Sequence, residues 1–123
     1  RSTLFPYTTL FRSRDKNGTL MRLGSWNCVI EKGTKAFEIY KKDSISERHR
    51  HSYEVNKEYV KTLEEKGLKV SGYSNDDHKF VEIVEIKEHP WFVAVQFNPE
   101  FQSRPTRPHP LFISFIKAAL NKK

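Results

Sequence analysis

The sequence predicts an α/β fold in which helices flank a mixed β-sheet. Two observations predict this class. Short runs rich in β-branched and aromatic residues alternate with segments whose apolar residues recur at helical spacing. In addition, the apolar run "VAVQF" stops at an Asn-Pro-Glu turn, and open α/β sheets place ligand-facing groups just past the carboxyl ends of strands. No internal repeat divides the chain, so these elements belong to one architecture.

The first elements lie around two glycines. The apolar runs at 20–24 and 27–30 predict two short strands on either side of Gly24. The segment 34–42, which follows Gly33, predicts a short helix.

A second helix is expected in "NKEYVKTLEEKG". Val60, Leu63 and Glu64 recur there at helical spacing, and Gly67 supplies the residue that favours the left-handed conformation at a helix end.

Three further strands are predicted by "LKVSGYS", "KFVEIVEI" and "FVAVQF", with the polar segment "SNDDHK" as the turn between the first two. The last of them is expected to end at Asn98, because a residue that precedes proline is held extended and Pro99 cannot continue the ladder. Glu100 then lies in the turn beyond the strand. It is either a ligand-facing group or an ordinary solvated carboxylate.

The final segment, "PHPLFISFIKAALNKK", predicts the clearest helix. Pro110 suits a first helical position, and the basic end suits the helix dipole. The apolar residues that share one face of this helix are Leu111, Phe112, Phe115, Ile116, Ala119 and Leu120.

Composition limits the function classes. The 123 residues are 37% apolar and 30% charged, which is typical of a globular protein, and no run approaches the roughly 18 apolar residues of a membrane span. The single cysteine, Cys28, excludes an internal disulfide framework and suits a reducing compartment. The net charge of +7 invites a nucleic-acid interpretation, but acidic residues are interleaved with the basic ones.

The amino-terminal segment 1–13 looks foreign to the rest of the chain. It resembles neither a secretory signal nor an amphipathic helix. Residues 3–13, "TLFPYTTLFRS", match codon by codon the translation of a common sequencing-library adapter. We therefore expect 1–13 to be adapter-derived and 14–123 to be the native part, with a net charge of +5.

The stretch "ERHRHSYEVN" is the first candidate for chemistry. On a strand, His49 and His51 share one face while Arg48 and Arg50 share the other. A metal site is not favoured, because no third ligand stands at a suitable spacing. The remaining interpretations are a basic strand that faces an anion or carboxylate, and a polar edge strand. Cys28 lies within an apolar strand and is expected to be a buried packing residue rather than a nucleophile.

The order of several motifs resembles one family. "MRLG", "ERHRHSYEVN", "GLKVSG", "VEIVE", "HPWFVAVQFNPEFQSRP" and "HPLFISFIKAAL" are similar to the C-terminal half of the class I glutamine amidotransferase (glutaminase) domain of CTP synthases. The resemblance extends from Gly18 to Leu120. It implies a class I glutamine amidotransferase-like α/β fold, truncated at the N-terminus, with 14–123 as the C-terminal half of the domain.

The resemblance also implies a Cys-His-Glu triad that hydrolyses glutamine to glutamate and ammonia. A thiolate attacks the amide carbon, a histidine takes and returns the proton, and a carboxylate orients the histidine. Glu100 matches the orienting glutamate, but Asn98 stands at the catalytic histidine position. Ser52 stands where the family has the arginine that binds the glutamine α-carboxylate. The nucleophilic cysteine is expected upstream and is missing, so the chain is predicted to be inactive.

The rest of the parent enzyme follows from the same resemblance. A separate synthetase domain is expected to use ATP and Mg to aminate UTP, within a cytoplasmic homotetramer, while this part needs no cofactor or metal. One-base changes account for both Asn98 and Ser52. They are therefore either reading errors or marks of a decayed amidotransferase that uses free ammonia or serves as a scaffold. The alternative function is a small basic module that binds RNA or an acidic partner through "RHRH" and "SRPTRPHP".

Overall fold

A computed structural model describes residues 11–13, 21–77 and 79–121 of the chain, with the side chains of 11–13 left undescribed. The strands are β1 (Phe11–Ser13), β2 (Arg22–Ile30), β3 (Ser44–His51), β4 (Tyr53–Val55), β5 (Leu68–Ser74), β6 (Val81–Ile86) and β7 (Val93–Val95). The α-helices are α2 (Lys35–Tyr40), α3 (Val60–Glu65) and α4 (Pro110–Leu120), and the 3₁₀ helices are η1 (Lys57–Tyr59) and η2 (Pro99–Gln102).

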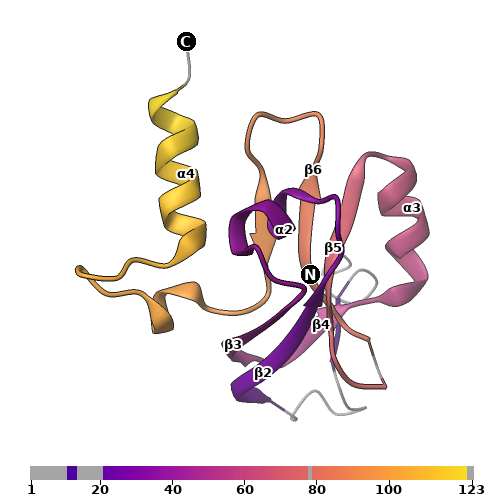
Figure 1. The fold of residues 1–123 in the computed structure, drawn as a ribbon. Coiled ribbons are helices and arrows are strands. Elements are labelled where there is room, and N and C mark those ends of the chain that lie inside the picture. Colours follow the sequence, from indigo (N-terminus) through magenta and orange to yellow (C-terminus); the bar gives the residue numbers. More distant parts are fainter. Residues whose placement is uncertain (1–10, 14–20, 78, 122–123) are drawn as a thin grey trace, which may run out of the picture.

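One five-stranded sheet organises the described residues (Figure 1). Its strand order is β3-β2-β5-β6-β7, while β1 and β4 form a separate two-stranded sheet. The predicted α/β class with flanking helices is confirmed. Every strand pair among the described residues is antiparallel, so the parallel strands that a mixed sheet implies are not among them.

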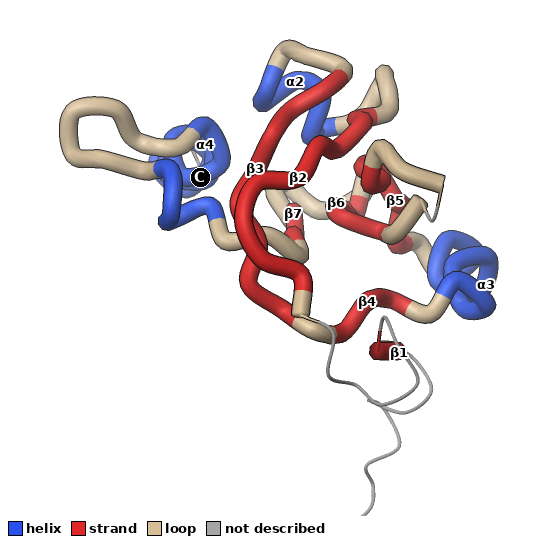
Figure 2. The backbone as a smooth tube through the Cα atoms, turned by 90° about the horizontal axis from the view of Figure 1, so that it is seen from below, coloured by secondary structure: helices blue, strands red, loops and turns tan. Residues whose placement is uncertain are grey.

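The helices lie on opposite faces of this sheet. Ile83 packs in a core cluster with Ala36 of α2 and Leu111 of α4. The next residue, Val84, lines a groove together with Leu63 of α3. Because successive residues of a strand point to opposite faces, α2 and the start of α4 cover one face and α3 covers the other. Figure 2 shows α4 and α3 on opposite sides of the strands.

The predicted break at Gly24 is wrong. Residues 22–30 form one strand, and its pairing with β3 runs without interruption from Arg22 opposite His51 to Val29 opposite Ser44. Gly24 has a φ of +82° and still keeps its register opposite His49. A glycine adopts this conformation at little cost, so the strand continues through position 24 instead of ending there.

The predicted end of the last strand is also wrong. β7 stops at Val95 rather than at Asn98. Gln96 still donates its N–H to Glu82 in β6, but the N–H of Asn98 donates to the carbonyl of Arg48 in β3, at 2.9 Å. The chain therefore leaves one edge of the sheet and reaches the other before Pro99, which begins η2.

Five other predicted elements are present in the structure. The helix after Gly33, the helix that ends before Gly67 (φ +102°), the strands β5 and β6, and the terminal helix beginning at Pro110 are confirmed. Most of the suspected adapter segment lies outside the described residues.

Candidate active site

The Asn98–Glu100 turn is fastened to β3 by the side chain of Asn98. Its Oδ1 accepts the backbone N–H of Arg50 at 3.1 Å, and its Nδ2 donates to Oε2 of Glu100 at 3.3 Å. This orientation of the amide is the consistent one, because the oxygen meets a donor and the nitrogen meets a carboxylate. The turn is therefore held against the sheet with Glu100 exposed at its surface.

The chemistry available at position 98 is limited. An imidazole has a nitrogen that takes up a proton near neutral pH, whereas a carboxamide has none. Both polar atoms of Asn98 already have partners, Arg50 and Glu100. The side chain therefore preserves the shape of the turn and provides no group that could accept the proton of a thiol.

Ser52 lies close to this turn. It is half-buried in the short connection between β3 and β4, two residues after Arg50. The next residue, Tyr53, accepts a hydrogen bond on its carbonyl from Nε2 of Gln96 at 3.3 Å. Arg50 and Tyr53, on either side of Ser52, are thus both hydrogen-bonded to the segment 96–98. The structure therefore brings Ser52, Asn98 and Glu100 into one region.

The two faces of β3 differ as the alternation predicted. Arg48 and Arg50 are exposed, whereas His49 is buried and His51 is half-buried. Nδ1 of His49 lies 2.8 Å from Nε2 of His51. β3 is an edge strand of the sheet, which confirms the edge-strand interpretation.

A buried ion pair lies behind the histidines. The two terminal nitrogens of Arg22, Nη1 and Nη2, engage the carboxylate of Glu82 at 2.8 and 2.6 Å, and Nη1 also lies 3.4 Å from Oε2 of Glu54. Nε2 of His49 lies 3.6 Å from the same Glu82 carboxylate. Such a bidentate pair gives geometric specificity, so this cluster fixes the relative positions of β2, β3 and β6. Sequence reasoning missed it, because nothing in "MRLG" shows which carboxylate Arg22 meets.

Cys28 is a core residue, as expected. It is fully buried in β2. Burial raises the pKa of its thiol well above the ordinary value, and the nearby Glu82 carboxylate raises it further. A thiol with a raised pKa is a poor nucleophile.

Glu47 is a second buried feature that sequence reasoning missed. Its carboxylate accepts hydrogen bonds from the Tyr40 hydroxyl at 2.8 Å and from Nε2 of Gln102 at 2.8 Å, and lies 2.6 Å from Nε2 of His109. Nδ1 of His109 accepts the N–H of Leu111, so Nε2 carries the proton and donates to Glu47. Glu47 thereby ties η2, which carries Glu100, to α2 and α4. The indication of this role in the sequence is that Glu47 shares one face of β3 with Ile45 and His49, both of which are buried.

No group of three or more His, Cys, Asp or Glu side chains in the described ranges is arranged to hold a metal ion. Among the helices that the structure describes, none has the length and apolar character needed to cross a membrane.

Comparison with known proteins places this arrangement in a family. The family model "Glutamine amidotransferase class-I" matches residues 10–118. The CTP synthase of Caldanaerobacter subterraneus is 55% identical over 109 residues, which are 89% of this chain and 20% of that protein. The CTP synthase of Bacillus subtilis is 52% identical over 123 residues, 97% of this chain and 23% of that protein.

A solved structure agrees with these relatives. The Trypanosoma brucei CTPS glutaminase domain with bound acivicin superimposes with a TM-score of 0.84 at 39% identity, covering 93% of this chain and 47% of that chain. The chain spans about a fifth of the length of the curated relatives it matches. With most of its residues matched by the family model, the chain belongs to the class I glutamine amidotransferase family.

Proposed function

We propose that the chain is the C-terminal part of the glutaminase domain of a CTP-synthase-type enzyme. In such an enzyme, ammonia released from glutamine would be used elsewhere in the protein to aminate ATP-activated UTP. The CTP synthase relatives and the likeness to a CTPS glutaminase domain support this proposal.

Within that domain, we propose that Glu100 holds the place of the orienting carboxylate and Asn98 that of the catalytic histidine. The observation that carries this assignment is the geometry of Asn98, whose Nδ2 donates to Glu100 while its Oδ1 accepts from the strand at Arg50. An orienting carboxylate would make the same kind of contact to a histidine ring. Glutamine hydrolysis also needs a base, and Asn98 cannot act as one.

Ser52 has the second proposed role, at the place of the arginine that binds the glutamine α-carboxylate. An arginine there would make charge-assisted, bidentate hydrogen bonds, whereas serine can make one neutral bond. The nucleophile is the third missing group, because the single cysteine of this chain is buried in the core. The chain alone is therefore expected to release no ammonia from glutamine.

The proposal extends to the enzyme as a whole. ATP and Mg would serve the synthetase domain, and the glutaminase part would need neither. A homotetrameric, cytoplasmic enzyme is the assembly and setting that the resemblance implies.

A hybrid enzyme tests the roles of Asn98 and Ser52. The matching segment of Bacillus subtilis CTP synthase is replaced by this chain, and glutamate release is measured before and after Asn98→His and Ser52→Arg. Because a general base contributes about 10²–10⁴-fold, Asn98→His is expected to raise kcat by at least about 10²-fold. In the hybrid that carries Asn98→His, Ser52→Arg is expected to lower the KM for glutamine by about tenfold or more, since a hydrogen bond to a charged group contributes about 1.5–3 kcal/mol.

Ser44→Arg is the matched control for Ser52→Arg, because it adds the same charge at an exposed residue of β3, at the opposite end of the strand from Arg50. It is expected to leave the KM for glutamine unchanged. Rapid glutamate release by the unaltered hybrid would contradict the proposed roles.

A further inference from the structure

Two histidines on the same face of β3 are in direct contact. Nδ1 of His49 lies 2.8 Å from Nε2 of His51, and Nδ1 of His51 lies 3.0 Å from the carbonyl oxygen of Tyr53. At the other end of the pair, Nε2 of His49 lies 3.6 Å from Oε2 of Glu82. The two rings therefore form a continuous line of polar contacts from a buried carboxylate to the first residue of β4.

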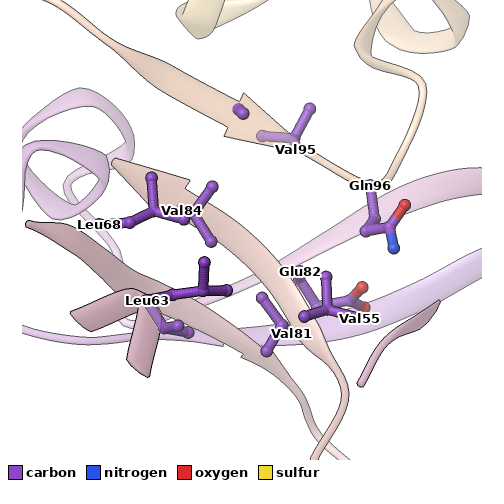
Figure 3. Close-up of a pocket in the computed structure, with 10 residues that line it drawn as sticks. Val55, Leu63, Leu68, Val81, Glu82, Val84, Val95 and Gln96 are labelled. Atoms are coloured by element: carbon purple, nitrogen blue, oxygen red, sulfur yellow. The ribbon is translucent and has the colours of Figure 1, made fainter. Parts of the chain in front are cut away.

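This line closes into a ring of contacts through Gln96. The backbone N–H of Gln96 donates to the carbonyl of Glu82 at 2.9 Å, and its side-chain Nε2 donates to the carbonyl of Tyr53 at 3.3 Å. Figure 3 shows Glu82 and Gln96 in the wall of one pocket. The ring of contacts thus joins β3, β4 and β6 to the segment after β7, and Ser52 lies between two of its members along the chain.

The directions of the contacts determine how many protons the histidine pair holds. A carbonyl oxygen only accepts, so Nδ1 of His51 carries a hydrogen. Two ring nitrogens 2.8 Å apart need one hydrogen between them. Nε2 of His49 faces the ionised carboxylate of Glu82, which also only accepts. Three hydrogens on the four ring nitrogens give the pair one positive charge, whereas a neutral pair would bring two acceptors together at one of these contacts.

The charges around the pair favour this state. Glu47, on the same face of β3, is bonded to η2 and α4 instead, and Phe97 brings an uncharged ring against His49. Two carboxylates and one guanidinium leave one negative charge, which the charge on the histidines balances. Of the described side chains, those that contribute these charges are Arg22 from β2, Glu82 from β6 and Glu54 from β4.

We propose that His49 and His51 share one extra proton at neutral pH, and that this charged pair positions the turn that carries Ser52. The third proton keeps the Nδ1–H of His51 on the Tyr53 carbonyl while the Nε2–H of His49 faces Glu82. When this proton leaves to solvent, one contact of the ring loses its hydrogen. The consequence for glutamine rests on the proposed function, because a displaced residue 52 would bind the α-carboxylate more weakly.

Nitrogen-15 NMR of the labelled chain tests the shared proton directly, because the chemical shift of a ring nitrogen shows whether it carries a hydrogen. At pH 7 we expect three protonated nitrogens in the pair, with His51 protonated at Nδ1. As the pH rises, both rings should lose the third proton with one common midpoint. His89 is the control with a midpoint of its own, since it is exposed and its Nδ1 accepts the N–H of Trp91.

The positioning role is measured in the Bacillus subtilis hybrid that carries Asn98→His and Ser52→Arg. His51→Phe keeps a ring but removes both nitrogens, and it is expected to raise the KM for glutamine at least about fivefold with kcat nearly unchanged. His51→Asn places an amide N–H where Nδ1 lies and should return the KM to within about twofold of the parent hybrid. His89→Phe, at an exposed residue, is the control and should leave the KM unchanged.

Two results would overturn the proposal. One is a pair that holds only two protons at pH 7, and the other is an equal KM for His51→Phe and His51→Asn. CTP formation from ammonia establishes that each variant hybrid is folded. A hybrid that hydrolyses no glutamine after Asn98→His and Ser52→Arg would contradict the proposed function instead, and the NMR spectra would still decide whether the pair shares a proton.

Discussion

Asn98 holds the Asn98–Glu100 turn in place, but its side chain has no nitrogen that takes up a proton near neutral pH. Asn98 links Arg50 in β3 to Glu100 in the turn, and a histidine at this position could make the contact to Glu100 through a ring N–H. The two residues differ in the ability to take up a proton near neutral pH. On the proposed assignment, the turn therefore keeps its shape while the group that would move the proton is absent.

Removal of Glu47 should destabilise the folded chain. Glu47→Ala leaves the donors of Tyr40, Gln102 and the buried His109 without their acceptor. Leaving a buried donor without its acceptor costs about 1–3 kcal/mol, and a loss of at least this size is expected in the free energy of unfolding measured in urea. Glu65→Ala, at an exposed position in α3, is the control and should change it by less than about 0.5 kcal/mol. Equal effects would show that the Glu47 network contributes little.

The raised pKa values of Cys28 and Tyr40 predict that the folded chain loses stability at alkaline pH. Burial raises the pKa of both groups in the folded chain, and Glu47 raises that of Tyr40 further. The stability gained by burying the neutral thiol and the neutral hydroxyl is fully present below the ordinary pKa values of 9.0 and 10.0. It is lost as the pH rises above those values. Each group then lowers the free energy of unfolding by about 1.4 kcal/mol per pH unit.

Urea unfolding at pH 7 and pH 10.5 measures this effect. Cys28→Ala should be less sensitive to the change of pH than the unaltered chain. An identical pH dependence in the two proteins would contradict the assignment of Cys28 as a buried, protonated thiol.

Among single residues, the sequence predicted the features that follow from the alternation of side chains between the two faces of a strand. The opposite faces of His49 and Arg48, and the burial of Cys28, followed from the strand period. The partners of Arg22 and Glu47 lie up to 60 and 62 positions away along the chain. No local pattern specifies such pairs, so they could not be predicted.

Among the elements, β5 contains the most restrictive backbone position. Gly72 lies at an irregularity in the pairing of β5 with β6. A Cβ added there would lie 2.8 Å from Cδ1 and Cγ1 of Ile83 and 3.0 Å from the sulfur of Cys28. Overpacking of a core costs about 1–3 kcal/mol, so Gly72→Ala should lower the free energy of unfolding by this amount.

A double-mutant cycle shows whether this cost is steric. Ile83→Ala removes both atoms that a Cβ at position 72 would meet, so the double variant should be less destabilised than the sum of the single variants. Simple additivity would mean that Gly72→Ala acts through the backbone instead.

Element boundaries were predicted less well than the elements themselves. The sequence predicts a strand that ends at Gly24, yet β2 continues through it because pairing with β3 outweighs the local preference. The last strand was expected to continue to Asn98, but it ends at Val95 because Asn98 bonds to β3 instead. In both cases a tertiary contact determined the boundary.

For the whole molecule, the layer architecture followed from the sequence but the strand order did not. The order β3-β2-β5-β6-β7 depends on pairs such as Cys28 with Ser74, which are distant in the sequence. The alternation of elements cannot distinguish among such orders. The resemblance to an amidotransferase domain implied the fold class and no strand order.

The distribution of charge predicts weak binding to nucleic acid. Arg22 is buried against Glu82, and acidic residues accompany the basic ones along the chain. Few phosphates would be neutralised together, so the logarithm of affinity for duplex DNA should fall with the logarithm of salt concentration with a slope of magnitude below about 3. A slope of about 6 or more, from titrations at several salt concentrations, would favour the alternative of an RNA-binding module.

CTP formation by the unaltered hybrid with Bacillus subtilis CTP synthase tests the central claim most directly. The claim is that Asn98 and Ser52 silence glutamine chemistry in an otherwise intact amidotransferase fold. The rate is measured once with ammonia and once with glutamine as the nitrogen source, with ATP, Mg and UTP present. The account predicts CTP formation from ammonia and none above background from glutamine. Glutamine-dependent CTP formation at a rate comparable to that with ammonia would contradict it.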